Sequence, residues 1–435
     1  MRRLTRILAV TGASSILALS VAAPAGATPG PRNEQWWFAA WQIQQKVWPA
    51  GKGAGVTVAV IDSGVNTRLP DLRPAVVPGK DFRLADDWSG GSGDGRSDTD
   101  PEGHGTAMAA LIVSQGAGSG YVGVAPEAKV LPVVASGPST AEAVRYAADH
   151  GAKVINVSQG DPAPFDRCPA DVQQAIGYAI QHDSLVVAAS GNEGGSTNGS
   201  LSPGMCAGVL TVGAIDNRKR AWPKTQRKPY VAVAGPGANV GIVRPNGSFD
   251  AGFSGTSQAA ALVSGAAALV WSKNPRLSNR EVAQRLIATA KDAGPPGKDD
   301  QTGAGVVIPG DAMSANVPPS APNPVFAAYD RWAKTQPKGA QGTARKPGGA
   351  ASSSPQEEEG GSGTLLIIGV AGAALLVVIV LIVVLFARKG KGRGGPPQGP
   401  GAPAPGMYPG GQAPGGPPPG WGGPPGRQGP PPGYR

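Results

Sequence analysis

The sequence predicts an α/β protein with a doubly wound, mostly parallel sheet, helices on both faces, and one C-terminal transmembrane helix. Short runs of β-branched and apolar residues alternate with longer helical segments from residue 56 to about residue 290, which is typical of βαβ units. Several of the short runs are apolar throughout, as in strands that are buried on both faces. A long uncharged run near the C-terminus has the length needed to cross a bilayer.

The distribution of charge along the chain argues against a nucleic-acid partner. The chain has 435 residues and a formal net charge of +10, which by itself is compatible with nucleic-acid binding. Acidic and basic residues nearly balance between residues 33 and 311, so the excess of positive charge lies in the N-terminal leader, the late linker and residues 388–393. These are positions that flank membrane segments, and we therefore expect no nucleic-acid partner.

Residues 1–27 have a basic start, an apolar core and the small residues Ala25-Gly26-Ala27, which predict a cleaved secretory signal peptide. An uncleaved membrane anchor is the alternative. Secretion would bring Cys168 and Cys206 into an oxidising compartment, where a disulfide is expected, with two buried free thiols as the other interpretation.

Residues 28–55 form a Trp-rich N-terminal segment that includes Trp36, Trp37, Trp41 and Trp48. We expect it to contain a first helix packed on the surface of the domain. A role in binding a partner is the alternative.

Residues 56–315 form the predicted globular domain. The expected strands are 56–61, 128–134, 153–157, 185–189, 209–212 and 230–234, and the expected helices are 107–114, 140–150, 170–182, 256–272 and 279–290.

Candidate site residues stand where these elements begin or end. Asp62 follows the first strand, and catalytic groups in open α/β sheets collect at the carboxyl ends of strands, although Asp-Ser-Gly is also a turn signal. His104 lies between glycines at a helix start, which suits a side chain that faces a cleft. His150 and His182 fall near helix ends, where a capping role is sufficient.

The segment 86–102 is acidic and rich in glycine. Its oxygens could hold calcium, but its spacing does not match an EF-hand, so we expect a solvated flexible loop and no metal site.

The stretch Gly255-Thr256-Ser257 opens a helix of small and apolar residues. A serine there is a useful nucleophile only if a base and an acid that orients the base lie nearby. The alternative is a small-residue helix packed tightly on the sheet.

The C-terminal part changes character. Residues 316–363 are rich in Pro, Gly and Ser and predict a linker, residues 364–387 predict the transmembrane helix, and 388–435 predict a basic and then Pro/Gly-rich disordered tail. The basic residues after the span place the tail in the cytoplasm and the domain outside the plasma membrane. A polyproline ligand is the alternative interpretation of the tail.

Three stretches together resemble the signature blocks of subtilisin-like serine proteases (peptidase S8 family): Val60–Gly64, His104–Thr106 and Gly255–Ser257, in the order Asp, His, Ser. The resemblance implies that Ser257 is the nucleophile, His104 the general base and Asp62 the residue that orients it, with no cofactor. Asn192, in a stretch that resembles the family's oxyanion block, would be an oxyanion donor.

The same resemblance implies a substrate pocket with two walls. Its substrate-binding residues are Ser158, Gln159 and Gly160 on one wall and Ser190 and Gly191 on the other. Glu193 would lie at the mouth, which favours a basic or polar group there.

The signal peptide, the Trp-rich segment, the cysteine pair and the linker before one membrane span resemble the mycosins, over residues 33 to about 393. Mycosins are membrane-anchored proteases of type VII secretion systems. The resemblance implies protein substrates and association with the secretion membrane complex. Gln258 and Ala261 depart from the family's usual apolar residue and proline.

Two further functions remain open: a mainly structural subunit of the secretion complex, or a general cell-surface degradative protease. The basic loop between Arg218 and Lys228 is expected to be a solvated loop, with a partner contact or a cleavage site as alternatives.

Overall fold

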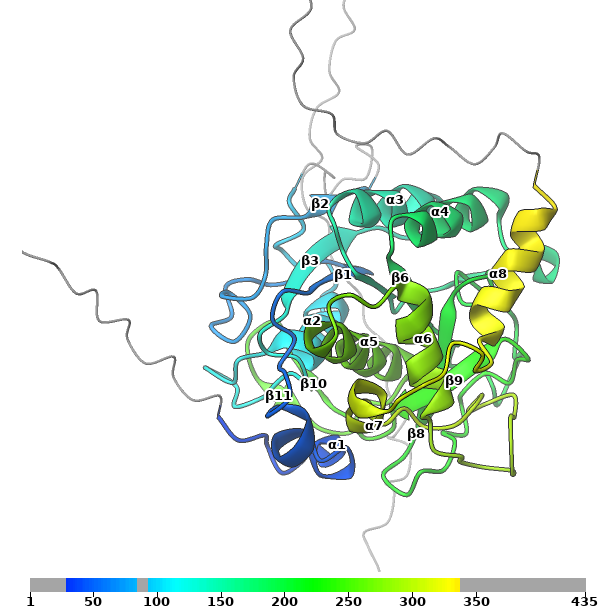
Figure 1. Cartoon of the computed structure of the whole chain (residues 1–435). Helices are drawn as coiled ribbons and strands as arrows, with labels where there is room; N and C mark the ends of the chain where they lie inside the picture. The colour runs from blue at the N-terminus through cyan, green and yellow to red at the C-terminus, as the bar shows by residue number, and fades with distance from the viewer. Residues whose placement is uncertain (1–28, 84–92, 337–435) are drawn as a thin grey trace, which may run out of the picture. The chain divides into compact units, whose positions relative to one another are not determined.

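The computed structural model describes residues 29–83 and 93–336 (Figure 1). Its core is a seven-stranded sheet in the order β2-β3-β1-β4-β6-β8-β9, and every neighbouring pair is parallel. The strands are β1 (Thr57–Asp62), β2 (Lys80–Asp81), β3 (Lys129–Val134), β4 (Val154–Val157), β6 (Leu185–Ala189), β8 (Leu210–Ile215) and β9 (Val231–Pro236). The prediction of a doubly wound, mostly parallel sheet is confirmed.

Helices cover both faces of this sheet. Helices α3 (Thr140–Asp149) and α4 (Ala170–Gln181) lie side by side and pack on strands β1, β3, β4 and β6. Helix α5 (Thr256–Lys273) packs under β4, β6, β8 and β9, together with α2 (His104–Val113) and α6 (Asn279–Ala288). Figure 1 shows these two groups of helices on opposite sides of the strands.

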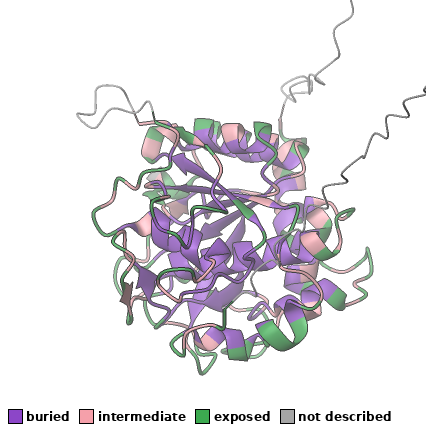
Figure 2. Cartoon of the chain, turned by 90° about the vertical axis from the view of Figure 1, so that its left-hand side faces the viewer, coloured by how far each residue is buried: buried purple, intermediate pink, exposed green. Residues whose placement is uncertain are grey.

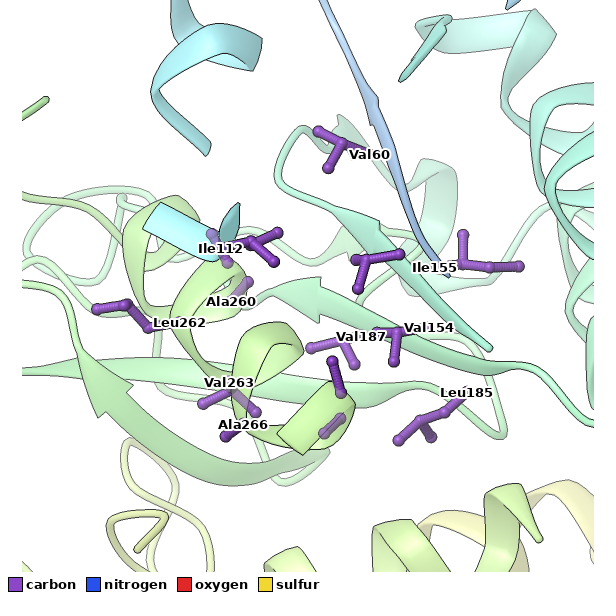
Figure 3. Packing of buried hydrophobic residues seen from close by; sticks show 14 of the residues in the cluster. Val60, Ile112, Val154, Ile155, Leu185, Val187, Ala260, Leu262, Val263 and Ala266 are labelled. Atoms are coloured by element: carbon purple, nitrogen blue, oxygen red, sulfur yellow. The ribbon is translucent and has the colours of Figure 1, made fainter. Parts of the chain in front are cut away.

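Helix α5 is the centre of the core because nearly all of its sides are small or apolar. Every residue from Thr256 to Trp271 is buried, as expected for a helix enclosed by a sheet and other helices. Figure 3 shows Ala260, Val263 and Ala266 of this helix beside strand residues such as Val187. Burying one leucine or valine side chain of this kind contributes about 1.5–3 kcal/mol.

Burial follows the predicted pattern of apolar strands. The strands of the main sheet are almost entirely buried, and the exposed residues lie in loops and on outer helix faces (Figure 2). Two short antiparallel pairs lie outside the main sheet: β5 (Asp161–Pro162) with β7 (Leu201–Ser202), and β10 (Ile242–Val243) with β11 (Phe249–Asp250). Each of these strands has only two residues. A strand this short cannot show an alternation of apolar and polar residues, so the sequence does not predict it.

The Trp-rich segment packs onto the domain. It forms α1 (Trp36–Ala40) and a π-helical turn (Ile43–Val47). Trp37 is fully buried, and Trp48 is nearly so and donates a hydrogen bond from Nε1 to the carbonyl of Val124 at 2.9 Å.

The structure agrees with two further predictions, the capping role of His150 and His182 and the disulfide between Cys168 and Cys206. His150 and His182 are the residues that end α3 and α4, and each places Nδ1 within 2.9 Å of the backbone carbonyl four residues earlier. Cys168 and Cys206 are joined in a disulfide with a Cα–Cα distance of 5.1 Å.

The structure differs from the predicted linker of residues 316–363 at its start. After α7 (Pro309–Ser314), residues Pro324–Lys334 form a further helix, α8, in which Val325, Phe326 and Tyr329 are buried. The Pro- and Ala-rich composition hid this short apolar face, so the globular part extends at least to α8. The rest of the predicted linker, the signal peptide (1–27), the transmembrane helix (364–387) and the tail (388–435) lie outside the described residues.

Candidate active site

The candidate catalytic residues converge at one edge of the sheet. Asp62 is the last residue of β1, His104 is the first residue of α2, and Ser257 is the second residue of α5. The carboxyl ends of parallel strands meet at this edge, which is where open α/β sheets place their ligand sites. Gly105 allows the close approach, because a Cβ there would lie 2.2 Å from the carbonyl oxygen of Gly64.

Asp62 and His104 form a tight pair. Both carboxylate oxygens of Asp62 lie within 2.9 Å of His104 Nδ1. The carboxylate also accepts hydrogen bonds from the backbone N–H of Ser63 at 2.8 Å and from its hydroxyl at 3.2 Å. Asp62 is 1% exposed and His104 keeps 36% of its side-chain surface accessible, so the acid is enclosed while the imidazole remains partly accessible to solvent.

Ser257 is held against the neighbouring strand end. Its hydroxyl donates to the carbonyl oxygen of Ser158 at 2.8 Å, and the hydroxyl of Ser158 donates back to the carbonyl of Ser257 at 3.2 Å. In this rotamer the hydroxyl of Ser257 is hydrogen-bonded to Ser158 and not to His104. Hydrogen bonds between a serine nucleophile and its base are often long or absent without substrate and tighten when substrate is bound.

Asn192 presents an oriented amide beside Ser257. Its Oδ1 accepts from both the backbone N–H and the hydroxyl of Thr256 at 2.9 Å, so the start of α5 fixes the orientation of the amide. Thr256 in turn accepts from the N–H of Gly191 at 3.0 Å. The helix that carries the serine therefore fixes the side chain of Asn192, the donor predicted from the oxyanion block, and Asn192 is exposed.

The electrostatic setting of His104 is acidic. Burial alone would lower its pKa, but the negative charge and hydrogen bond of Asp62, with further charges on Asp100 and Asp98, outweigh burial and raise the pKa of His104 from 6.5 to about 9. A base of this kind holds its proton through neutral pH.

The segment 86–102 is predicted to be a solvated loop, but two of its acidic residues, Asp98 and Asp100, form hydrogen bonds with the start of α2 beside His104. Asp98 accepts from the backbone N–H and hydroxyl of Thr106, at 2.8 and 2.5 Å, and Asp100 accepts from the N–H of His104 at 3.1 Å. Burial raises the pKa of Asp98 although these hydrogen bonds oppose the shift. No spacing rule relates Asp98 to Thr106, so only the fold reveals the contact.

The predicted pocket walls lie side by side. Ser158–Gly160 follow β4 and Ser190–Gly191 follow β6, and these two strands are paired in register Val157↔Ala188. Gln159 donates to the carbonyl of Ala135 at 3.2 Å. Ser190 is 1% exposed, and its hydroxyl has no hydrogen-bond partner among the described residues.

Glu193 follows Asn192 and is exposed, and its carboxylate accepts from the hydroxyl of Ser196 at 2.5 Å. The two residues that depart from the family pattern, Gln258 and Ala261, are buried in α5 behind the serine. In the basic loop Arg220 pairs with Asp216 at 2.7 Å and is exposed, as expected for a solvated loop.

Within residues 29–83 and 93–336, no helix is both long and apolar enough to cross a bilayer. The same part of the chain has no group of three His, Cys, Asp or Glu side chains arranged to hold a metal ion.

Comparison with known proteins gives consistent matches. The model of the subtilase family matches residues 53–305. Subtilisin Savinase from Lederbergia lenta is 37% identical over 254 residues, which cover 56% of this chain and 86% of that protein. Mycosin-4 from Mycobacterium tuberculosis is 34% identical over 334 residues, which cover 66% of this chain and 70% of that protein.

A solved structure has the same fold. The MycP3 protease from the type VII (ESX-3) secretion system matches with a TM-score of 0.55 and 33% identity, covering 67% of this chain and 90% of that structure. The chain is thus similar to a subtilisin over 254 residues and to a mycosin over 334 residues.

Proposed function

This chain belongs to the subtilase family as a mycosin-type, subtilisin-like serine endopeptidase, and on that premise we propose that Asp62, His104 and Ser257 are its catalytic triad. The observation that carries the proposal is the Asp62–His104 pair at 2.8 Å on the sheet edge where Ser257 begins α5.

The chemistry follows from the positions of the donors and acceptors. His104 accepts the proton of Ser257 as the hydroxyl attacks a peptide carbonyl, and it returns that proton to the leaving amine. Asp62 keeps Nδ1 protonated and stabilises the imidazolium. The oxyanion that forms receives hydrogen bonds from the amide of Asn192 and the backbone N–H of Ser257, and water then releases the acyl group from the serine.

We further propose that the protease is anchored by a single span at residues 364–387, with the domain outside and the tail in the cytoplasm. The sequence supports this with an uncharged run followed directly by basic residues. The mycosin and MycP relatives support an association with a type VII secretion complex, whose secreted proteins would then be the substrates.

The test compares the full chain with Ser257→Ala and with His182→Ala, a histidine that caps a helix away from the site. Peptide hydrolysis should be lost in the first variant and kept in the second. If Ser257→Ala hydrolyses peptides as fast as the wild type, the assignment of the triad is refuted. A separate outcome concerns the cell. If Ser257→Ala leaves secretion intact while deletion of the whole chain abolishes secretion, the protein supports secretion as a structural subunit.

A further inference from the structure

We propose that Arg244 is a positioning residue of this protease: it ties the segment before His104 to the segment before Ser257 and so fixes the general base relative to the nucleophile. The inference deepens the proposed function and rests on it, because it takes His104 and Ser257 as the reacting pair.

The base and the nucleophile are each held by a different neighbour. Asp62 holds His104 at the end of β1, and the carbonyl of Ser158, after β4, accepts the hydroxyl of Ser257. Helices α2 and α5 also pack on one another, but both reacting residues stand in the first turns of these helices. There the entering loops determine how each side chain is placed, so a contact between the two loops sets the distance from base to nucleophile.

A short hairpin leads into the nucleophile. It consists of β10 and β11, and Arg244 begins the turn between them, where its N–H donates to the carbonyl of Ser248 at 2.8 Å. Strand β10 packs beside α2 (Figure 1). Strand β11 ends at Asp250, seven positions before Ser257, so a shift of the hairpin is passed on to the start of α5.

The turn of this hairpin packs against the residue that precedes His104. A Cβ built on Gly103 would lie 2.4 Å from Cγ of Pro245, so the two segments are already in close contact. The side-chain amide of Asn66 donates to the carbonyl of Pro245 at 2.7 Å, which fastens the same turn to the loop after β1.

The guanidinium of Arg244 makes three contacts, one with each of the parts to be joined. One arm binds the carboxylate of Glu102, two residues before the base, and the other donates to the carboxylate of Asp250 at 2.7 Å. Its central carbon lies 5.0 Å from the ring centroid of Phe253, four residues before the nucleophile. A planar guanidinium can hold two carboxylates and an aromatic face in fixed directions, which a single ammonium group cannot do.

The contact with Glu102 leads directly to the general base. The N–H of Glu102 and the N–H of His104 donate to the two oxygens of one carboxylate, that of Asp100, each at 3.1 Å. Glu102 and His104 therefore belong to one hydrogen-bonded turn, and a shift of Glu102 moves the start of α2. Misplacing reacting groups by about 1 Å can lower a rate by about 10²-fold.

These ion pairs are too exposed to matter much for folding. The side chains of Arg244, Glu102 and Asp250 are 25%, 64% and 41% exposed, and pairs at such positions contribute little to the free energy of unfolding. The loss of Arg244 should therefore appear in turnover and not in the thermal transition.

The experiment measures kcat and KM of the full chain on one internally quenched peptide at pH 10, where His104, with its pKa of about 9, is mostly neutral. Arg244→Gln should lower kcat at least ~10-fold and change KM less than ~3-fold. Glu102→Gln should lower kcat at least ~3-fold. The double variant should be no slower than Arg244→Gln alone, because both changes break the same contact.

Arg280→Gln is the matched control. Arg280 pairs with Asp330 at 2.7 Å and its guanidinium lies 4.7 Å from the ring centroid of Phe326, so it makes both kinds of contact. Its neighbour Asn279 donates to the carbonyl of Ser184 at 3.0 Å, which places the pair by the amino end of β6, opposite the edge that carries the nucleophile. This variant should keep the wild-type kcat and KM.

A wild-type kcat in folded Arg244→Gln overturns the inference. So does a raised KM with unchanged kcat, which would make Arg244 a substrate contact. An equal loss in Arg280→Gln, or a double variant slowed by the product of the two single losses, overturns it as well. If Arg244→Gln loses its thermal transition, Glu102→Gln decides in its place, by whether its kcat falls while its KM stays.

A serine-directed phosphonate separates the two levels of the argument. Labelling of Ser257 in the wild type, together with a wild-type kcat in Arg244→Gln, refutes the role of Arg244 alone. Failure to label the folded wild type refutes the proposed function and this inference with it.

Discussion

Replacing Asp100 by asparagine should lower the pKa of His104 and move the activity of the enzyme toward neutral pH. The carboxylate accepts a hydrogen bond from the N–H of His104 at 3.1 Å, and its charge is one of those that raise the pKa of the imidazole to about 9. A general base must be neutral to accept a proton. With a pKa of about 9, only about one molecule in a hundred has a neutral His104 at pH 7.

The size of the shift follows from Coulomb's law. One neighbouring carboxylate charge in partly solvated surroundings contributes about 1 kcal/mol to the stability of an imidazolium, a little under one pKa unit. Asp100→Asn should therefore lower the midpoint of the kcat/KM profile by nearly one pH unit. At pH 7 the variant should be about sevenfold faster than the wild type, and at pH 10 the two should be nearly equal.

The assay is the pH dependence of kcat/KM between pH 6 and 10 at constant ionic strength on one peptide substrate. Asp94→Asn is the matched control, because Asp94 belongs to the same acidic segment but pairs with Arg96 at 2.6 Å. An unchanged midpoint in Asp100→Asn, or an equal shift in the control, would show that the acidic loop does not set the pKa of His104.

Three other variants test separate parts of the structure. Asn192→Ala should lower kcat by about 10²–10³-fold with little change in KM, because an oxyanion donor acts only in the transition state; steady-state kinetics measures this. Cys168→Ala with Cys206→Ala should lower the free energy of unfolding by about 4 kcal/mol in a chain-entropy model, since the bridge spans 38 residues, as read by urea denaturation. Phe326→Ala should cost about 3–5 kcal/mol because the ring is 2% exposed, whereas Phe165→Ala, at 93% exposure, should leave the urea midpoint unchanged.

The fold and the three central residues could be predicted because their signals are local. Asp62 ends an apolar run, and a polar residue at that point of a parallel strand must lie on the sheet edge. His104 and Ser257 lie in the first turns of helices that begin directly after Gly103 and Gly255, at the same edge of the sheet. The order of the three stretches and the parallel topology then bring them together.

The surroundings of His104 could not be predicted, because they depend on contacts between loops. Asp98 looked like one of several solvated acids, and its hydrogen bonds to Thr106 exist only because the loop folds back over the start of α2. Ser63 is similar: its hydroxyl donates to Asp62 and accepts from the N–H of Gly105, joining the ends of β1 and α2.

Short elements also escaped prediction. The strand that carries Leu201 has two residues and pairs with a strand of two residues, so no alternation of apolar and polar residues can form. Helix α8 contains three buried residues, Val325, Phe326 and Tyr329, within one turn and a half, and a Pro- and Ala-rich composition conceals so brief a pattern. Helix α8 extends the globular part at least to Lys334.

The central claim is that Ser257 is a nucleophile activated by His104. It is tested most directly by exposing the folded full chain to a fluorophosphonate and locating the adduct by mass spectrometry, in the wild type and in His104→Ala. We predict one adduct per chain, on Ser257, that forms at least ~10³-fold more slowly in His104→Ala. An unlabelled Ser257 in folded wild-type protein, or equal rates in the two proteins, would contradict the account.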